Sequence, residues 1–194
     1  QEELRLATSG GLKFQIPFAA LDEVDYSFGK VVYLSDLQPV GVQWLPRIDL
    51  PDSAQLISQY GLPRQNQSFD GSTLSLLWPN EAKPEIRAKD SIKIYSKGLA
   101  LRSRTILKYR LPPQMQRFSA IAGIDPATVA HGNVFLEISS GNKILWQGEI
   151  SGAASPVEIQ FDLGGVQQLG ILVDYGDNLD FGDRLHLVEA RVTK

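Results

Sequence analysis

Hydrophobic side chains recur with a period of two along most of this chain. Val134, Leu136 and Ile138 alternate with other residues, and Leu169, Ile171 and Val173 do the same. This period is typical of strands that bury one face, because successive side chains of a strand point to opposite sides. Turn signals rich in Gly, Asn, Asp and Ser separate the segments. The pattern predicts an all-β fold of many short strands, in a β-sandwich or a barrel.

The alternation predicts strands along most of the sequence. They cover residues 12–16, 31–34, 40–44, 73–78, 92–95, 106–109, 118–124, 134–138, 144–146, 157–161, 169–173 and 185–192. Helical pattern is scarce: residues 52–60 predict one short helix, and residues 18–21 a single turn. Trp44 and Trp146 are in phase with apolar neighbours, so we expect both in the core.

Composition excludes several kinds of site. The 194 residues include no cysteine and two histidines, which excludes disulfides, Cys-ligated metals and a Cys nucleophile. The net charge of −3 gives no basic footprint for nucleic acid. No apolar run approaches the roughly 18 residues of a transmembrane helix, so we expect no membrane span in this segment. The common catalytic and phosphate-binding motifs are missing, so we expect no enzyme and no cofactor. A glycosidase or esterase whose catalytic groups meet only in space stays open.

The most unusual stretch is an acidic loop near the C-terminal end. Aspartates at 174, 177, 180 and 183 recur every third residue, with Asn178 and glycines between them. Oxygen ligands in a loop can bind calcium, but this spacing does not match an EF-hand. Clustered Asp, Asn and Gly is equally typical of a plain surface loop. Tyr175 and Phe181 are candidates for stacking on a sugar ring.

Basic residues flank the strand expected at 106–109. Arg102, Arg104, Lys108 and Arg110 share parity, so they are expected to line one face of a sheet. That face is either an ordinary solvated one or a binding surface, where arginine engages hydroxyl or carboxylate oxygens. His186 follows the acidic loop in an alternating segment, either on a polar strand face or in a ligand site.

Several stretches after residue 30 resemble motifs of the NPCBM domain family, also described as carbohydrate-binding module family 51. Tyr33–Leu37 resembles the family's Y-L-S-D-L strand, and Tyr95–Leu99 its Y-x-K-G-[IL] motif. Phe118–Asp125, Gly132–Ile138 and Leu169–Asp177 resemble three later motifs, in matching order and spacing. The resemblance implies a jelly-roll β-sandwich of the galactose-binding-domain-like type. It also implies sugar binding, often as an accessory to extracellular glycoside hydrolases, and some members carry a structural calcium.

The sequence departs from the family pattern at polar positions. Where the family usually has histidine, this chain has Arg102 and Arg184. The family's D-H-x-D-W stretch also has an aspartate and a tryptophan where this chain has His186 and Leu187. The core positions are kept, which supports the fold and puts the usual sugar specificity in question. The paired change suggests that the two arginines lie near each other.

We therefore expect residues 1–27 to form an N-terminal β extension, packed on or leading into a sandwich of residues 28–194. The chain begins at Gln1 without a leader pattern, so we expect a processed or truncated piece. The leading hypothesis is a non-catalytic carbohydrate-binding-like module of a larger exported bacterial protein, in the periplasm, at the cell surface or outside the cell. Its partners would be a glycan and other domains of the parent chain. The alternative is a structural or protein–protein interaction sandwich that has lost sugar binding. The expected ligand-binding residues are Tyr95, Arg102, Arg104, Tyr175, Asp177, Asn178, Asp180, Asp183, Arg184 and His186.

Overall fold

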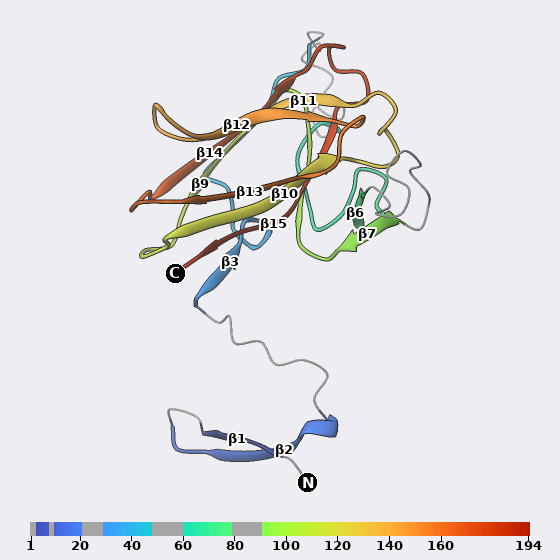
Figure 1. Ribbon diagram of the computed structural model, residues 1–194. Coiled ribbons are helices and arrows are strands. Elements are labelled where there is room, and N and C mark those ends of the chain that lie inside the picture. The colour runs from blue at the N-terminus through green and yellow to red at the C-terminus, as the bar shows by residue number, and fades with distance from the viewer. Residues whose placement is uncertain (1–2, 8–9, 21–28, 48–59, 79–90) are drawn as a thin grey trace. The chain divides into compact units, whose positions relative to one another are not determined.

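The structure is a computed structural model, and it describes residues 3–7, 10–20, 29–47, 60–78 and 91–194 (Figure 1). The chain divides into two compact units, Gln1–Lys30 and Val31–Lys194. The strands are β1 (Glu3–Ala7), β2 (Lys13–Pro17), β3 (Val31–Tyr33), β4 (Gly41–Trp44), β5 (Arg64–Gln65), β6 (Leu74–Leu77), β7 (Ile92–Tyr95), β8 (Gly98–Arg102), β9 (Thr105–Arg110), β10 (Arg117–Ile124), β11 (Asn133–Ser140), β12 (Lys143–Ser151), β13 (Val157–Asp162), β14 (Gln168–Tyr175) and β15 (Arg184–Thr193). Two 3-10 turns, η1 (Phe18–Ala20) and η2 (Leu34–Asp36), complete the described elements, and η1 confirms the turn predicted at 18–21.

The first unit is an antiparallel hairpin of β1 and β2. Its register pairs Leu4 with Ile16 and Leu6 with Phe14. Residues two apart in a strand point the same way, so these four apolar side chains share one face. Leu6 and Phe14 remain 45% and 48% exposed. The face therefore has no complete apolar cover within its own unit.

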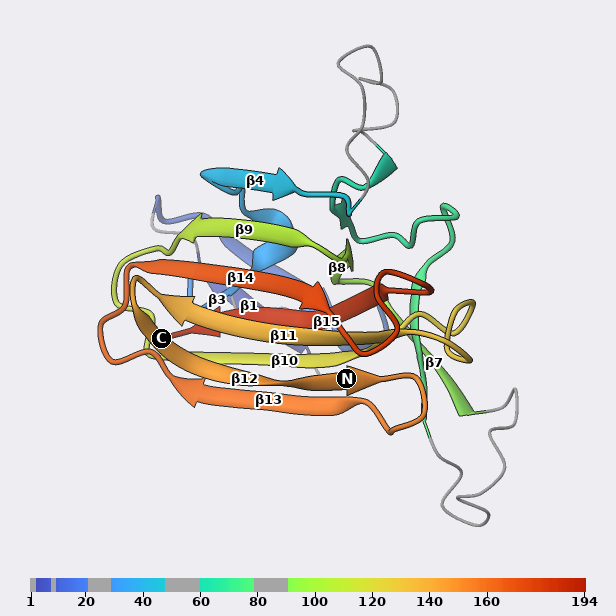
Figure 2. The same cartoon turned by 90° about the horizontal axis from the view of Figure 1, so that it is seen from above.

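The second unit is a sandwich of two antiparallel sheets. One sheet has the order β13-β10-β15-β8-β5, with β3 also paired to β15. The other has the order β12-β11-β14-β9-β4, and its strands lie side by side in Figure 2. The jelly-roll β-sandwich predicted from the alternation and the family motifs is confirmed.

The core lies between the two sheets and follows the period of two. Leu169, Ile171 and Val173 of β14 are buried while the residues between them are not. Phe118 of β10 faces inward, and its ring stacks on that of Phe161 with centroids 4.9 Å apart. Burying side chains of this kind contributes about 1.5–3 kcal/mol each, so the alternating face supplies most of the drive to fold.

A small third layer covers part of the outer face of the first sheet. The hairpin of β6 and β7 places Leu74 and Leu76 against Ala100 of β8 and Val188 of β15. All four side chains are completely buried. Under this hairpin the sheet therefore packs apolar side chains on both of its faces.

Two sequence predictions about side-chain direction were wrong. Arg102 and Lys108 do not share a face, because Arg102 ends β8 in one sheet and Lys108 lies in β9 of the other. The expected phase of Trp146 with its apolar neighbour Ile144 is also wrong, because the register of β11 and β12 shifts before Ser139 and leaves Ile144 50% exposed. Leu145 and Trp146 pack against the core instead. The short helix expected at 52–60 falls almost entirely outside the described residues.

No helix in the described part of the chain is long and apolar enough to cross a membrane.

Candidate functional site

Arg102 and Arg184 meet at one end of the sandwich. Arg102 is the last residue of β8 and Arg184 the first of β15, and the antiparallel register sets them directly opposite each other. The proximity expected of these two positions is therefore confirmed. Residues directly opposite on one sheet face have Cβ atoms about 4.5–5.5 Å apart, so the two cations act on a common space.

Two adjoining hollows open at this end, each with a volume of about 240 Å³. The first, here called the Trp44 hollow, is lined by Trp44, Pro46, Tyr60, Arg102, Ser103, Asp180 and Asp183. The second, the Phe181 hollow, is lined by Arg102, Ala127, Thr128, His131, Phe181, Gly182, Asp183 and Arg184. Arg102 and Asp183 belong to both. The two hollows therefore adjoin each other, and together they form a candidate site with aromatic and charged walls.

Trp44 forms a wall of the first hollow. Its indole Nε1 donates a hydrogen bond to the carbonyl of Ser103, 3.1 Å away. The backbone of Gly61 lies so close to the ring that a Cβ there would sit 1.9 Å from it. Only glycine permits this approach, which fixes the ring in place. The sequence prediction that Trp44 faces the core is wrong, because β4 is an edge strand and the tryptophan turns toward the loops.

The acidic loop closes the other side of the site. Asn178 Nδ2 donates to the carbonyl of His131 and, at 3.2 Å, to that of Phe181, which joins the loop to the 125–132 turn. Phe181 is 64% exposed, and its ring centroid lies 5.0 Å from that of His131. Asp177 and Asp180 are exposed at the loop tip. Among the described residues, no three His, Asp or Glu side chains come close enough to hold a metal ion.

Asp183 ends the same loop but is buried. Its carboxylate accepts a hydrogen bond from Ser103 Oγ at 2.7 Å and from the backbone N–H of Asn133 at 3.2 Å. Loss of hydration on burial raises the pKa of this carboxyl, and the two hydrogen bonds partly oppose that rise. Asp183 thus links three segments around the site.

His186 lies beneath the site and is completely buried. Its Nδ1 donates to the carbonyl of Ser75 at 2.8 Å, and its Nε2 lies 3.1 Å from Ser68 Oγ. Ser68 Oγ in turn donates to Asp125 at 2.9 Å. Desolvation lowers the pKa of the imidazole. His186 therefore anchors the 66–72 loop, whose Phe69 packs on Arg102.

The remaining predicted site residues lie farther out. Tyr95, the last residue of β7, accepts a hydrogen bond from Trp78 Nε1 at 2.9 Å and lines neither hollow. Tyr175 donates to the carbonyl of Leu45 at 2.9 Å. Arg104 pairs with Asp174 at 3.5 Å. The structure therefore brings Arg102, Asp180, Asp183 and Arg184 to the hollows, and it places Tyr95, Arg104 and Tyr175 at supporting contacts.

Sequence reasoning missed several residues at or beside the site. Tyr60 and Phe69 both contact the Arg102 guanidinium, with ring centroids 4.1 and 4.4 Å from its Cζ atom. Tyr60 ends the segment predicted as a short helix and Phe69 lies in a loop, so only their aromatic character could have marked them. His131 precedes the turn at Gly132 and was interpreted from the sequence as an ordinary solvated loop histidine.

Comparisons with known proteins agree with this architecture. The NPCBM/NEW2 domain family matches residues 30–193. A CBM51 domain from a Clostridium perfringens GH95 protein, solved in complex with methyl-galactose, is 19% identical, with a TM-score of 0.66 over 84% of this chain and 99% of its own. The tandem CBM51 modules of a Streptococcus pneumoniae family 98 glycoside hydrolase are 17% identical, with a TM-score of 0.64 over 84% of this chain.

Other solved relatives are longer than this chain. The chain spans 47% of the tandem-module structure and 36% of a structure of the CBM51-2 and INT domains of Clostridium perfringens ZmpB, solved with GlcNAc. The latter is 17% identical, with a TM-score of 0.67 over 98% of this chain. No curated protein sequence matches the chain. The family match over residues 30–193, with which the sandwich fold agrees, shows that the chain belongs to the NPCBM/NEW2 domain family of carbohydrate-binding modules.

Proposed function

We propose that the sandwich binds a carbohydrate at the Trp44 and Phe181 hollows and performs no chemistry on it. The observation that carries the proposal is the pairing of aromatic walls with charged hydrogen-bonding groups at one end of the fold. Trp44 and Phe181 offer apolar ring faces to the C–H side of a sugar ring. Arg102, Arg184 and Asp180 offer donors and acceptors to its hydroxyls.

The absence of catalysis is part of the proposal. Glycoside hydrolysis needs two carboxyl groups with free oxygens on either side of the scissile bond. Of the two carboxylates at the Trp44 hollow, Asp183 is buried and already accepts two hydrogen bonds. Among the described residues of this lining, Asp180 is then left without a partner carboxylate. We further propose that the domain serves a larger exported bacterial protein, since the solved relatives include modules joined to other domains.

A glycan array followed by isothermal titration tests the proposal. We expect binding of at least one glycan, and we expect Phe181→Ala to weaken it about tenfold, because the exposed ring is the most accessible stacking surface. Leu179→Ala is the matched control: it lies two residues away in the same loop, is 52% exposed and lines neither hollow. Binding with unchanged affinity in the Phe181 variant, or release of free sugar from the bound glycan, would contradict the proposal.

A structural or protein-interaction role is the second candidate. The specific observation in its favour is the burial of His186 and Asp183, which removes two polar side chains from the ligand surface expected from sequence. An array on which no glycan binds, together with a correctly folded protein, would favour this role over sugar binding.

A further inference from the structure

The arginine pair at the Phe181 hollow is unusual because two like charges face each other across a strand pair. Arg184 and Arg102 are register partners, and both line the hollow. Like charges directly opposite on one face of an antiparallel pair destabilise it. The arrangement therefore calls for a counter-charge.

Among the described residues, no carboxylate forms an ion pair with either arginine. Arg102 is instead packed by the rings of Tyr60 and Phe69, and its Nε and Nη2 atoms are buried without a hydrogen-bond partner. Desolvation lowers the pKa of Arg102 and the charge of Arg184 adds to that shift, while Tyr60 and the charge of Asp125 oppose it. A cation held in a partly desolvated place interacts more strongly with any charge that reaches it than a cation in water does.

The carboxylates of Asp125 and Asp70 act on the two arginines through their charge, but their hydrogen bonds come from other donors. Asp183 accepts from Ser103 and Asn133, as described above. Asp125 accepts from Ser68 Oγ and from the backbone N–H of Ala127, each at 2.9 Å. Asp70 accepts from the N–H and the hydroxyl of Ser72, at 2.9 and 2.6 Å. The lining of the Phe181 hollow is thus left with two guanidinium groups and one carboxylate whose oxygens are in use.

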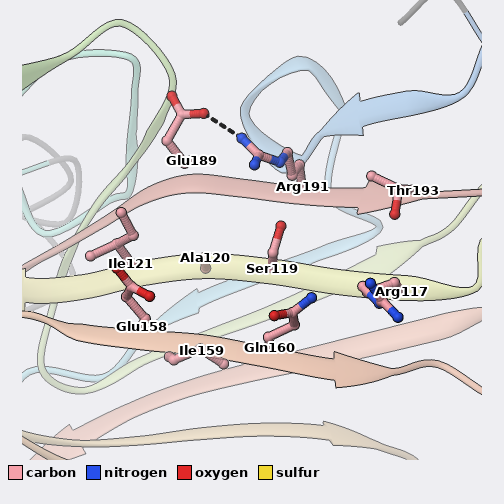
Figure 3. A pocket seen from close by; sticks show the side chains of 10 residues that line it. All are labelled: Arg117, Ser119, Ala120, Ile121, Glu158, Ile159, Gln160, Glu189, Arg191 and Thr193. Atoms are coloured by element: carbon pink, nitrogen blue, oxygen red, sulfur yellow. Dashed lines mark hydrogen bonds and ion pairs between the residues drawn. The ribbon is translucent and has the colours of Figure 1, made fainter.

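Two arginines beside a groove elsewhere on the molecule interact with carboxylates of the chain itself. The groove has a volume of about 400 Å³ and crosses the outer face of β13, β10 and β15 (Figure 3). There Arg191 Nη1 donates to Glu189 at 2.7 Å, and Arg117 Nε lies 3.5 Å from Asp162. Both arginines have carboxylate partners from the chain itself. In the described part of the chain, by contrast, no carboxylate lies within ion-pair distance of Arg102 or Arg184, which leaves both able to bind an anionic group.

We propose that the Phe181 hollow takes an anionic sugar, with its carboxylate or sulfate group at Arg102 and Arg184 and its C–H face toward Phe181. The inference rests on the proposed carbohydrate binding and names the class of sugar. Guanidinium groups match both oxyanions, because their planar N–H donors can engage two oxygens at once. A neutral sugar offers hydroxyls but no charge to offset the facing cations.

The test is a titration series on the whole chain with sugars that differ only in charge. An array that carries each sugar in neutral, uronate and 6-sulfated form selects the best ring, and isothermal titration then measures its three methyl glycosides. We expect the uronate or the sulfate to bind at least tenfold more tightly than the neutral form. We also expect that advantage to shrink between about 50 and 500 mM NaCl, as screening predicts. The two anionic arms distinguish a carboxylate from a sulfate ligand.

Variants assign the preference to the arginine pair. Arg184→Gln should reduce the affinity for the anionic sugar about tenfold or more, since a hydrogen bond to a charged group contributes about 1.5–3 kcal/mol. It should weaken the neutral form less, because only a neutral hydrogen bond is lost there, so the ratio of anionic to neutral affinity falls. Arg117→Gln, in the groove of Figure 3, is the matched control and should change neither affinity. Thermal midpoints verify that the variants fold. If Arg184→Gln does not fold, the anion preference of the unaltered chain and its salt dependence still test the anionic class of sugar.

The outcomes separate this inference from the proposed function. Equal or tighter binding of the neutral form overturns the anionic class and leaves carbohydrate binding standing. An anion preference that survives Arg184→Gln overturns the assignment to the arginine pair. An array without any bound glycan, acidic or neutral, overturns the proposed function itself.

Discussion

His186 connects β15 to Ser75 and to Ser68 through its two ring nitrogens. A carbonyl oxygen can only accept, so Nδ1 of this ring holds a proton and donates it to Ser75. The Ser68 hydroxyl has one proton to give, and both Asp125 and the second ring nitrogen are within reach of it. Because burial favours the neutral imidazole, we assign the uncharged form to the folded protein.

This assignment gives a pH prediction. The folded-state pKa of His186 is lowered, so the unfolded chain binds more protons once the pH drops below its ordinary value of about 6.5. Its contribution to the free energy of unfolding is fully present above about pH 6.5 and is lost as the pH falls toward the folded-state pKa. Urea unfolding at several pH values between about 5.5 and 7.5 should show this slope, and His186→Gln should flatten it. An unchanged slope in the variant would contradict the assignment.

At the same scale, sequence reasoning found the arginines and missed the rings around them. The proximity of Arg102 and Arg184 was expected because both stand where the family usually has histidine. Trp44 was assigned to the core because it is in phase with Val40 and Val42. Those two residues are 67% and 39% exposed, at the start of an edge strand and within it. Alternation reports which residues share a face, and it does not report whether that face is covered.

At the scale of elements, the β6–β7 hairpin explains why one strand could not be predicted from hydrophobic alternation. Gly98–Arg102 was not predicted as a strand, because four of its five residues are buried and no alternation remains. The hairpin covers its outer face while the opposite sheet covers its inner one. The strands with one face in solvent, such as β11 and β14, were predicted within one or two residues at each end.

The hairpin itself gives a stability prediction. Leu74→Ala should lower the free energy of unfolding by about 2–5 kcal/mol, because the side chain is completely buried and its loss leaves a cavity. Ile94→Ala is the matched control on the facing strand, where the side chain is 70% exposed, and it should cost less than about 1 kcal/mol. Chemical denaturation measures both. Equal losses in the two variants would show that the hairpin is not a packed layer.

For the molecule as a whole, the two units differ in how much apolar surface each buries. Residues 31–194 contain the whole sandwich core, whereas residues 1–30 contain a two-stranded hairpin with a half-exposed apolar face. A single hairpin is marginally stable in water. Whether this hairpin packs on the sandwich, as the sequence led us to expect, stays a prediction.

Separate expression of the two units tests their autonomy. A chain of residues 31–194 should melt cooperatively, and a peptide of residues 1–30 should show no cooperative transition, as followed by circular dichroism and proton chemical-shift dispersion. A cooperative transition in the short peptide, or failure of the longer chain to fold, would contradict this division.

The register of β15 has a consequence for how such a domain can be attached to others. The chain enters the sandwich at Val31 and reaches Thr193 beside it, because these two residues are register partners. Arg184, at the opposite end of the same ten-residue strand, lies at the proposed site. At about 3.3 Å per residue, roughly 30 Å separates the two ends of the strand. A tether attached at either Val31 or Thr193 would therefore join the sandwich at the end opposite the proposed site.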